Sequence, residues 1–452
     1  MAAPTVVTRR PKATAAERRE FAFSREMIPT LPTAAPGSDA LASYRLRAWE
    51  AFQRLPLPTP TDEAWRRTDL RELAVDTFRL PQPGSPFPPP PRCLLKPLVG
   101  KTHGGQIVLT PGAARSELSA ALSEQGVIFT DLLAAEQDHP DLLADLIGRI
   151  VRPEEGKFAA LAAAFAESGI LVYVPPGVHV EQPLHSVLWG PGLGLAHLSH
   201  ILVWLDEGAS LTYVHEAASP DENDGQTLHA GIVELRVGAG AHLTFVELQS
   251  WGNHVWNFSH ERAQVERDGE LDWIFGAVGS RLTKNFSDLN LVGEGATGRM
   301  SGFYFTDGVQ HLDHDTQQNH LAPHTTSDLL FKGALTGSSR SVWQGMIYVA
   351  PGAEKTDGYQ ANRNLVLSPS AHADSIPGLE ICADDVRCTH GATVGKIDPE
   401  PLFYLASRGI PHNEAVRLVV EGFFDPIMQR IPFDGVRSRF QHAIGDKMTS
   451  FS

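Results

Sequence analysis

Cysteine is scarce in this chain. Its 452 residues include only Cys93, Cys382 and Cys388, and no Cys-x-x-Cys pair is present. An odd, sparse set of thiols is typical of reduced cysteines and argues against a disulfide framework. One copy of the chain also lacks the four thiolates that a metal cluster held by cysteine alone requires. Such a cluster would need other ligand types or a second chain.

The chain also lacks an excess of positive charge and a long apolar run. Its 38 Lys and Arg residues face 53 Asp and Glu residues, which gives a formal net charge of -15. Nucleic-acid binders need clustered Lys and Arg in excess. No apolar stretch reaches the roughly 20 residues that span a bilayer, and residues 1–19 have no hydrophobic signal-peptide segment. We therefore expect a cytoplasmic protein without nucleic-acid or membrane partners.

A nucleotide-binding loop is missing as well. Gly100-Lys101-Thr102 matches the end of a P-loop, but the position that needs a glycine holds Leu95. The preceding segment is rich in proline and does not read as a strand. We expect no ATP site in this chain.

Three regions differ in their sequence pattern. Residues 1–168 read as helical or mixed, with a helical pattern up to about residue 80, a helix-like stretch at 132–147 and a proline-rich connector at 81–91. Residues 169–395 read as short strands rich in β-branched and aromatic residues. Residues 396–452 read as helical. Asp398 and Pro399 can begin a first helix there, and Gly409 can end it.

A second C-terminal helix is predicted from apolar side chains that share one face. Pro426 should kink or end this helix. The face consists of Val416, Val419, Val420, Phe423, Phe424 and Ile427.

The strand region has a regular repeat. Glycines in its turns, at 177, 208, 240, 269 and 295, are spaced by 31, 32, 29 and 26 residues. This spacing and the alternation of apolar and polar residues favour a mainly β fold, a β-solenoid of stacked coils. Four Asp-Gly pairs in the same region also suit hairpin turns, so a jelly roll or sandwich is the alternative.

Two blocks near the end of the strand region carry the most specific pattern. Residues 379–395 contain Cys-Thr-His-Gly-Ala-Thr-Val-Gly, and residues 402–409 follow with Leu405 in their centre. Together they resemble the closing signature of the SufB/SufD family of iron–sulfur cluster assembly scaffolds. The resemblance is to its SufD branch, because the B-type paralogue has a cysteine where Leu405 stands. Residues 62–70 and 313–333 are similar to further blocks of the family.

The resemblance implies a fold and a set of partners. It implies a right-handed parallel β-helix core that pairs through its last coils with a SufB-like paralogue. A SufC-like ATPase would attach to the C-terminal helices, and a transient iron–sulfur cluster would be shared at the interface. The chain itself would be a non-catalytic scaffold, and a lone copy could form a homodimer through the exposed last coil.

His390 is the main candidate site residue, and Cys388 is a weaker one. They lie two residues apart, so in a strand both side chains share a face. Imidazole and thiolate both ligate iron. From the residues alone, a structural histidine beside a buried thiol stays open; the resemblance favours His390 as part of the shared site. Cys382 is expected to be structural.

The candidate ATPase-docking residues follow from the same resemblance. They lie on the two C-terminal helices: Pro399, Leu402, Phe403, Tyr404, Arg408, Glu414, Arg417 and Glu421.

Other polar residues allow different readings. A zinc site among His311, His314, His320 and His324 is disfavoured by their spacing along a strand. Trp65 is expected to be a packing anchor, and Asn364 a member of an internal ladder. The alternative function is a β-helix carbohydrate lyase or hydrolase with paired carboxylates as acid and base. Its candidates are Asp313, Asp315, Asp374, Asp384 and Asp385.

Overall fold

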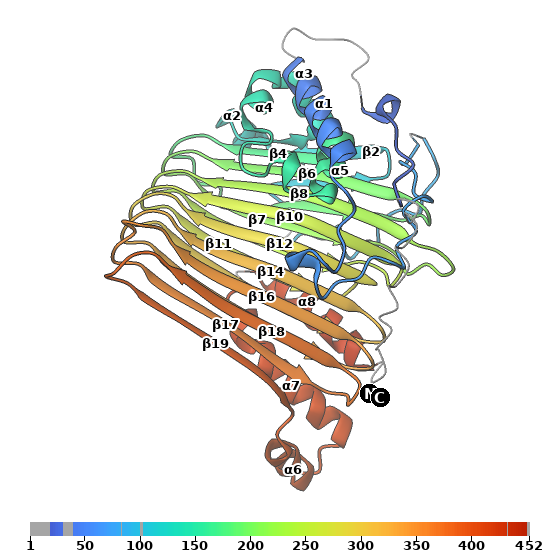
Figure 1. The fold of residues 1–452 in the computed structure, drawn as a ribbon, viewed down its shortest axis with the longest axis vertical. Helices are drawn as coiled ribbons and strands as arrows, with labels where there is room; N and C mark the ends of the chain where they lie inside the picture. The colour runs from blue at the N-terminus through green and yellow to red at the C-terminus, as the bar shows by residue number, and fades with distance from the viewer. Residues whose placement is uncertain (1–18, 30–38, 83, 100–102, 432, 450–452) are drawn as a thin grey trace, which may run out of the picture.

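Figure 1 shows a tall stack of β-strands with helices at its two ends and along its faces. This computed structural model describes residues 19–29, 39–82, 84–99, 103–431 and 433–449. Gly100-Lys101-Thr102 and Pro83 of the proline-rich connector therefore lie outside the described residues.

Strands occupy the middle of the chain, and helices precede and follow them. The strands are β1 (Gly105–Thr110), β2 (Ala113–Leu118), β3 (Ile128–Asp131), β4 (Ser168–Val174), β5 (Leu184–Trp189), β6 (Ala196–Leu205), β7 (Ser210–Ala218), β8 (Thr227–Val237), β9 (His242–Ser250), β10 (Val255–Val265), β11 (Glu270–Ala277), β12 (Leu282–Leu291), β13 (Thr297–Thr306), β14 (His311–His320), β15 (Thr326–Leu335), β16 (Arg340–Val349), β17 (Asp357–Val366), β18 (His372–Ile381) and β19 (Arg387–Lys396). The helices are α1 (Asp39–Arg54), α2 (Ala120–Glu124), α3 (Leu132–Asp138), α4 (Pro140–Leu146), α5 (Lys157–Phe165), α6 (Pro399–Ser407), α7 (His412–Met428) and α8 (Asp434–Thr449).

The strands form a parallel β-solenoid. Odd-numbered strands from β5 to β19 make one sheet and even-numbered strands from β4 to β18 make the other. Within a sheet, Thr297 pairs with Thr326 of the next coil, and Thr326 pairs with Asp357. Antiparallel pairing among the described strands is confined to β1 with β2 and β3 with β4. The solenoid prediction is confirmed, and the jelly roll is excluded because it needs antiparallel neighbours.

The interior of the solenoid is apolar along one part of the strands and polar along the rest. The apolar part contains stacked side chains such as Leu243, Phe245 and Trp273. The predicted asparagine ladder is wrong, because Asn364 pairs in register with Gly333 and Val394. Its amide instead donates to Asn362 Oδ1 at 2.6 Å, within a small buried network.

A helical layer from the N-terminal region covers the first coils on the outer face of the even-numbered sheet (Figure 1). Helix α5 packs there against β6 and β8, and α1 packs on α5. Trp65 is buried among Phe158, Phe258 and Phe286, so the packing-anchor prediction is confirmed. The sequence pattern predicts helix up to about residue 80, but the α-helix of this region, α1, ends at Arg54.

The expected helix at 132–147 is two helices. α3 ends at Asp138, and α4 begins at Pro140. Proline has no N–H for the i to i−4 hydrogen bond but suits the first turn of a helix, so it separates the two.

The C-terminal helices cover the outer face of the odd-numbered sheet. Val416, Val420 and Phe424 of α7 pack with Phe303 and Phe305 of β13, and α8 joins the same cluster. The boundaries predicted for α6 are confirmed, since the Asp398 side chain accepts a hydrogen bond from the Glu400 N–H and Gly409 has φ +83°. Pro426 does not end α7, which continues to Met428. No helix of the described residues is long and apolar enough to cross a membrane.

Candidate functional site at the open end of the solenoid

The last coil of the solenoid is open on one side. β18 pairs only with β16, and β19 pairs only with β17, among the described strands. Ile381 and Val394 on these strands are 42% and 50% exposed. An edge strand with free backbone groups and exposed apolar side chains is a template for another strand.

Cys388 points into the solenoid at this end. Its side chain is partly buried beside Ile347, Val349 and Ala353. A Cβ placed on Gly358 of the preceding coil would lie 3.2 Å from the Cys388 sulfur, so the thiol sits directly over that glycine. Burial is the largest influence on the pKa of this thiol and raises it. A raised pKa favours the protonated form, which is a poor nucleophile and a poor ligand.

His390 lies on the same strand face as Cys388 but is exposed. It pairs in register with Gln360 of the preceding coil. Gln360 is fully buried, and its Oε1 atom has no hydrogen-bond partner among the described residues. The imidazole therefore stands at the boundary between the polar interior and the open end, where a second chain can reach it.

Cys382 does not fit the structural role expected for it. It follows β18 directly and its side chain is exposed. The chain bends at Asp384 and Asp385 before β19 begins, as expected for those residue types. No group of three or more His, Cys, Asp or Glu side chains in the described part of the chain is arranged to hold a metal ion.

Helix α6 follows the open end and projects beyond β19 (Figure 1). Phe403 is 77% exposed and Tyr404 is 57% exposed. Leu402 differs from them, because it is partly buried against the cluster that contains Val416. The guanidinium of Arg408 lies 5.3 Å from the Tyr404 ring centre, which is within cation–π range.

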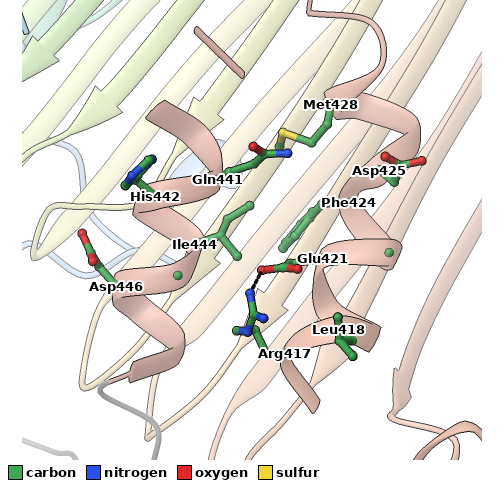
Figure 2. A pocket seen from close by; sticks show the side chains of 12 residues that line it. Arg417, Leu418, Glu421, Phe424, Asp425, Met428, Gln441, His442, Ile444 and Asp446 are labelled. Carbon is green, nitrogen blue, oxygen red and sulfur yellow. Dashed lines mark hydrogen bonds and ion pairs between the residues drawn. The ribbon is translucent and has the colours of Figure 1, made fainter. Parts of the chain in front are cut away.

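A groove of about 730 Å³ runs between α7 and α8 (Figure 2). Arg417 lines it and holds the carboxylates of Glu414 and Glu421, the latter at 2.6 Å. Hydrogen bonding from Arg417 is the largest influence on the pKa of Glu414 and lowers it. Phe424 and Ile444 form the apolar floor of the groove.

Comparisons with known proteins identify the family to which this solenoid chain belongs. Residues 190–423 match the family described as "SUF system FeS cluster assembly, SufBD core domain", and residues 33–185 match "SufBD protein N-terminal region". The chain belongs to the SufBD family. Its members with this core are iron–sulfur cluster assembly proteins.

Two relatives from Bacillus subtilis illustrate the similarity. The iron–sulfur cluster assembly protein SufD is 31% identical over 413 residues, which covers 90% of this chain and 94% of SufD. The iron–sulfur cluster assembly protein SufB is 31% identical over 316 residues, which covers 69% of this chain and 67% of SufB. A SufBD family protein of Staphylococcus epidermidis shows the same 31% over 316 residues.

Helix α8, which forms one wall of the groove beside α7, was not identified from the sequence. It supplies Gln441, His442, Ile444 and Asp446 to the groove. A signal was available, because Val436, Phe440, Ile444 and Met448 recur every four residues and are all buried.

Several of the remaining candidates are held by contacts within the chain. His314 is buried among Phe275, Tyr304 and Phe331. His320 bonds to Thr325 and Ser327. These two histidines therefore make separate contacts and do not meet at one site. Asp313 is fully buried beside Lys284 Nζ, at 3.0 Å, and cannot reach a polysaccharide. Asp374 is held by Arg340, and Asp385 by Lys355, at the surface.

Proposed function

We propose that this chain is a SufD-like scaffold subunit that pairs with a SufB-like paralogue for iron–sulfur cluster assembly and performs no catalysis itself. The observation that carries this is a similarity to SufD along 94% of its length. Leu405 supports the same assignment, because it removes the thiol that the B-type family signature has there. The similarity to SufB covers only 67% of that protein.

The shared site would combine His390 with ligands from the partner. Iron and sulfide are the substrates, and the chain's own contribution would be a neutral imidazole nitrogen at the open end. A cluster needs more ligands than His390 and the partly buried Cys388 can supply. The partner would therefore provide the cysteine that Leu405 replaces.

The pairing surface would be the edge formed by β18 and β19. Their free backbone groups and the exposed Ile381 and Val394 suit the addition of a partner's last coil. A lone copy has the same edge, so we expect it to form homodimers at high concentration.

A SufC-like ATPase would dock on α6 and on the outer side of α7. Phe403 and Tyr404 are exposed aromatic residues of the type that anchors interfaces. Three hydrogen bonds connect α7 and the residues after it to the odd-numbered sheet. Lys332 Nζ donates to the Phe423 carbonyl at 2.6 Å, and Arg430 donates to Ser301 and Asp328. Movement of the ATPases would thus reach β13 and β15, which lie behind the last two strands of the odd-numbered sheet.

The proposal is tested by anaerobic purification of the tagged full chain from its native host. The expected result is recovery of a SufB-like protein and an ATPase, with bound iron and sulfide. Recovery of the chain without these partners would contradict the scaffold role. A screen of the same preparation for polysaccharide cleavage tests the carbohydrate-enzyme alternative, for which we expect no activity.

A further inference from the structure

An arginine-rich cleft lies on the even-numbered sheet beside the N-terminal segment 66–72. Its volume is about 370 Å³. Four arginines line it, together with two carboxylates, one histidine and two buried apolar side chains. The lining residues are Arg67, Asp69, Arg71, Glu72, Trp256, Arg281, Leu282, His311 and Arg340. This local excess of positive charge is unusual in a chain with a net charge of -15.

The solenoid register builds one wall of the cleft. Leu282, which follows Arg281, pairs with His311, and His311 pairs with Arg340. Successive coils therefore place Arg281, His311 and Arg340 at the starts of three neighbouring strands, about 4.8 Å apart per strand. The opposite wall is the irregular segment that carries Arg67 and Arg71.

The protein's own carboxylates leave many guanidinium donors unused. Asp69 holds Arg71, Glu72 holds Arg281 at 3.0 Å, and Asp374 outside the lining holds Arg340 at 2.6 Å. Each arginine has five N–H donors, so these pairs do not saturate them.

Two donors stand out. The Nε atom of Arg340 is buried without a hydrogen-bond partner among the described residues. Arg67 makes no hydrogen bond or ion pair with any residue that the structure describes. A buried donor without a partner, such as Arg340 Nε, is rare in folded proteins and calls for a partner outside the protein. Arg67 is partly exposed, so its guanidinium is available to a ligand in the cleft.

His311 is uncharged at neutral pH, but its pKa reflects the positive charge of the cleft. Its pKa is lowered to about 4, first by burial and then by the positive charges of Arg340, Lys284 and Arg281, against the opposing effect of Asp313. At neutral pH the ring is therefore neutral, and its Nε2 atom shares a hydrogen bond with Thr68 Oγ1.

We propose that this cleft binds a small molecule that carries a phosphate or pyrophosphate group. Guanidinium groups bind phosphate oxygens through pairs of N–H donors, and arginines on two walls suit an anion with oxygens on several sides. The volume fits a ligand of small-molecule size. None of the lining residues lies on β18 or β19, although Asp374 of β18 holds Arg340, and the proposal does not depend on the proposed scaffold function.

The test is calorimetric titration of the purified full chain with inorganic pyrophosphate at low salt. We expect Arg67→Gln to weaken binding at least fivefold, because Arg67 faces the ligand and has no partner among the described residues. Arg66→Gln is the matched control, since Arg66 is exposed and does not line the cleft. It should change the affinity less than twofold.

Other outcomes would overturn the proposal. They are the absence of pyrophosphate binding, equal losses in both variants, and citrate binding as tight as that of pyrophosphate. The last would indicate a site for anions in general. Thermal unfolding of Arg67→Gln should match that of the unsubstituted chain, which separates loss of binding from loss of fold.

Discussion

Single buried charges fix how the N-terminal segment meets the solenoid. Lys284 Nζ lies 3.0 Å from Asp313 and 3.7 Å from Asp315, and neither Lys284 nor Asp313 is exposed. Thr68 donates to the same Asp313 carboxylate, and the Lys284 ammonium lies 4.7 Å from the Phe286 ring centre. A buried charge that loses its partner is far more costly than an exposed one.

Lys284→Met should therefore destabilise the chain by about 3–5 kcal/mol, because it leaves Asp313 buried and unpaired. The double variant Lys284→Met with Asp313→Leu should recover much of this loss. Chemical denaturation measures both. Lys355→Met is the control, because its pair with Asp385 is exposed and screened by solvent, so its loss should change stability little. Equal losses at Lys284 and Lys355 would contradict this account.

Buried histidines should set the stability of the chain in acid. Burial lowers the pKa of four of them to about 3 and of four more to about 4. They are His185, His197, His215 and His314 in the first set, and His229, His260, His311 and His320 in the second.

These histidines stay neutral in the folded chain but take up protons below pH 6.5 when it unfolds. The unfolded state then binds more protons, so stability falls as the pH drops through 6.5 toward 4. His314→Phe should reduce this slope by about 1.4 kcal/mol per pH unit, the effect of one proton. Urea unfolding at several pH values between 5 and 7 measures it. An unchanged slope, or the same reduction for the exposed His412→Phe, would be evidence against this cause.

At the scale of elements, repeats and caps were more predictable than contacts. The glycine spacing predicts the stacked coils because each coil must turn at a similar place, and Asp398 with Pro399 predicts where α6 begins. The split between α3 and α4 follows from Pro140, which the apolar pattern of the stretch conceals. The Arg417 ion pairs are local to α7, but the groove also needs α8, whose position is set by tertiary packing on Phe303 and not by local sequence.

The candidate site was predictable in its residues but not in its setting. The Cys-Thr-His-Gly block points to His390, and strand alternation places Cys388 on the same face. The sequence does not reveal that Cys382 is exposed, because burial depends on the coil ending at Ile381 with nothing stacked above it among the described strands. The position of Gln360 beneath His390 likewise requires the register between coils.

Helix α6 provides a prediction about the ATPase contact. Phe403→Glu should lower the affinity for a SufC-like ATPase at least tenfold, or about 1.4 kcal/mol, because it places a charge where an aromatic anchor is expected. Titration of the two purified proteins measures this. Val309→Glu is a matched control, since Val309 is 60% exposed on a solenoid turn and should leave the affinity unchanged. Full ATPase affinity in the Phe403 variant would place the contact elsewhere.

At the scale of the whole molecule, the solenoid carries a helical layer on each outer face and leaves one end open. Both sheets end there in a strand with a free edge, and α6 projects beside it. Such an arrangement leaves the edge exposed, and the proposed function places the paralogous chain on this last coil. On that proposal, His390 would lie where the two chains meet.

The most direct test of this account is anaerobic cluster assembly by the reconstituted complex of this chain, a SufB-like protein and a SufC-like ATPase. Iron and sulfide bound per complex are compared for the unsubstituted chain, His390→Ala and Thr389→Ala, the neighbouring residue on the opposite strand face. We predict that His390→Ala keeps its partners but loses most of the cluster, while Thr389→Ala retains it. A full cluster yield in the His390→Ala complex would contradict the central claim.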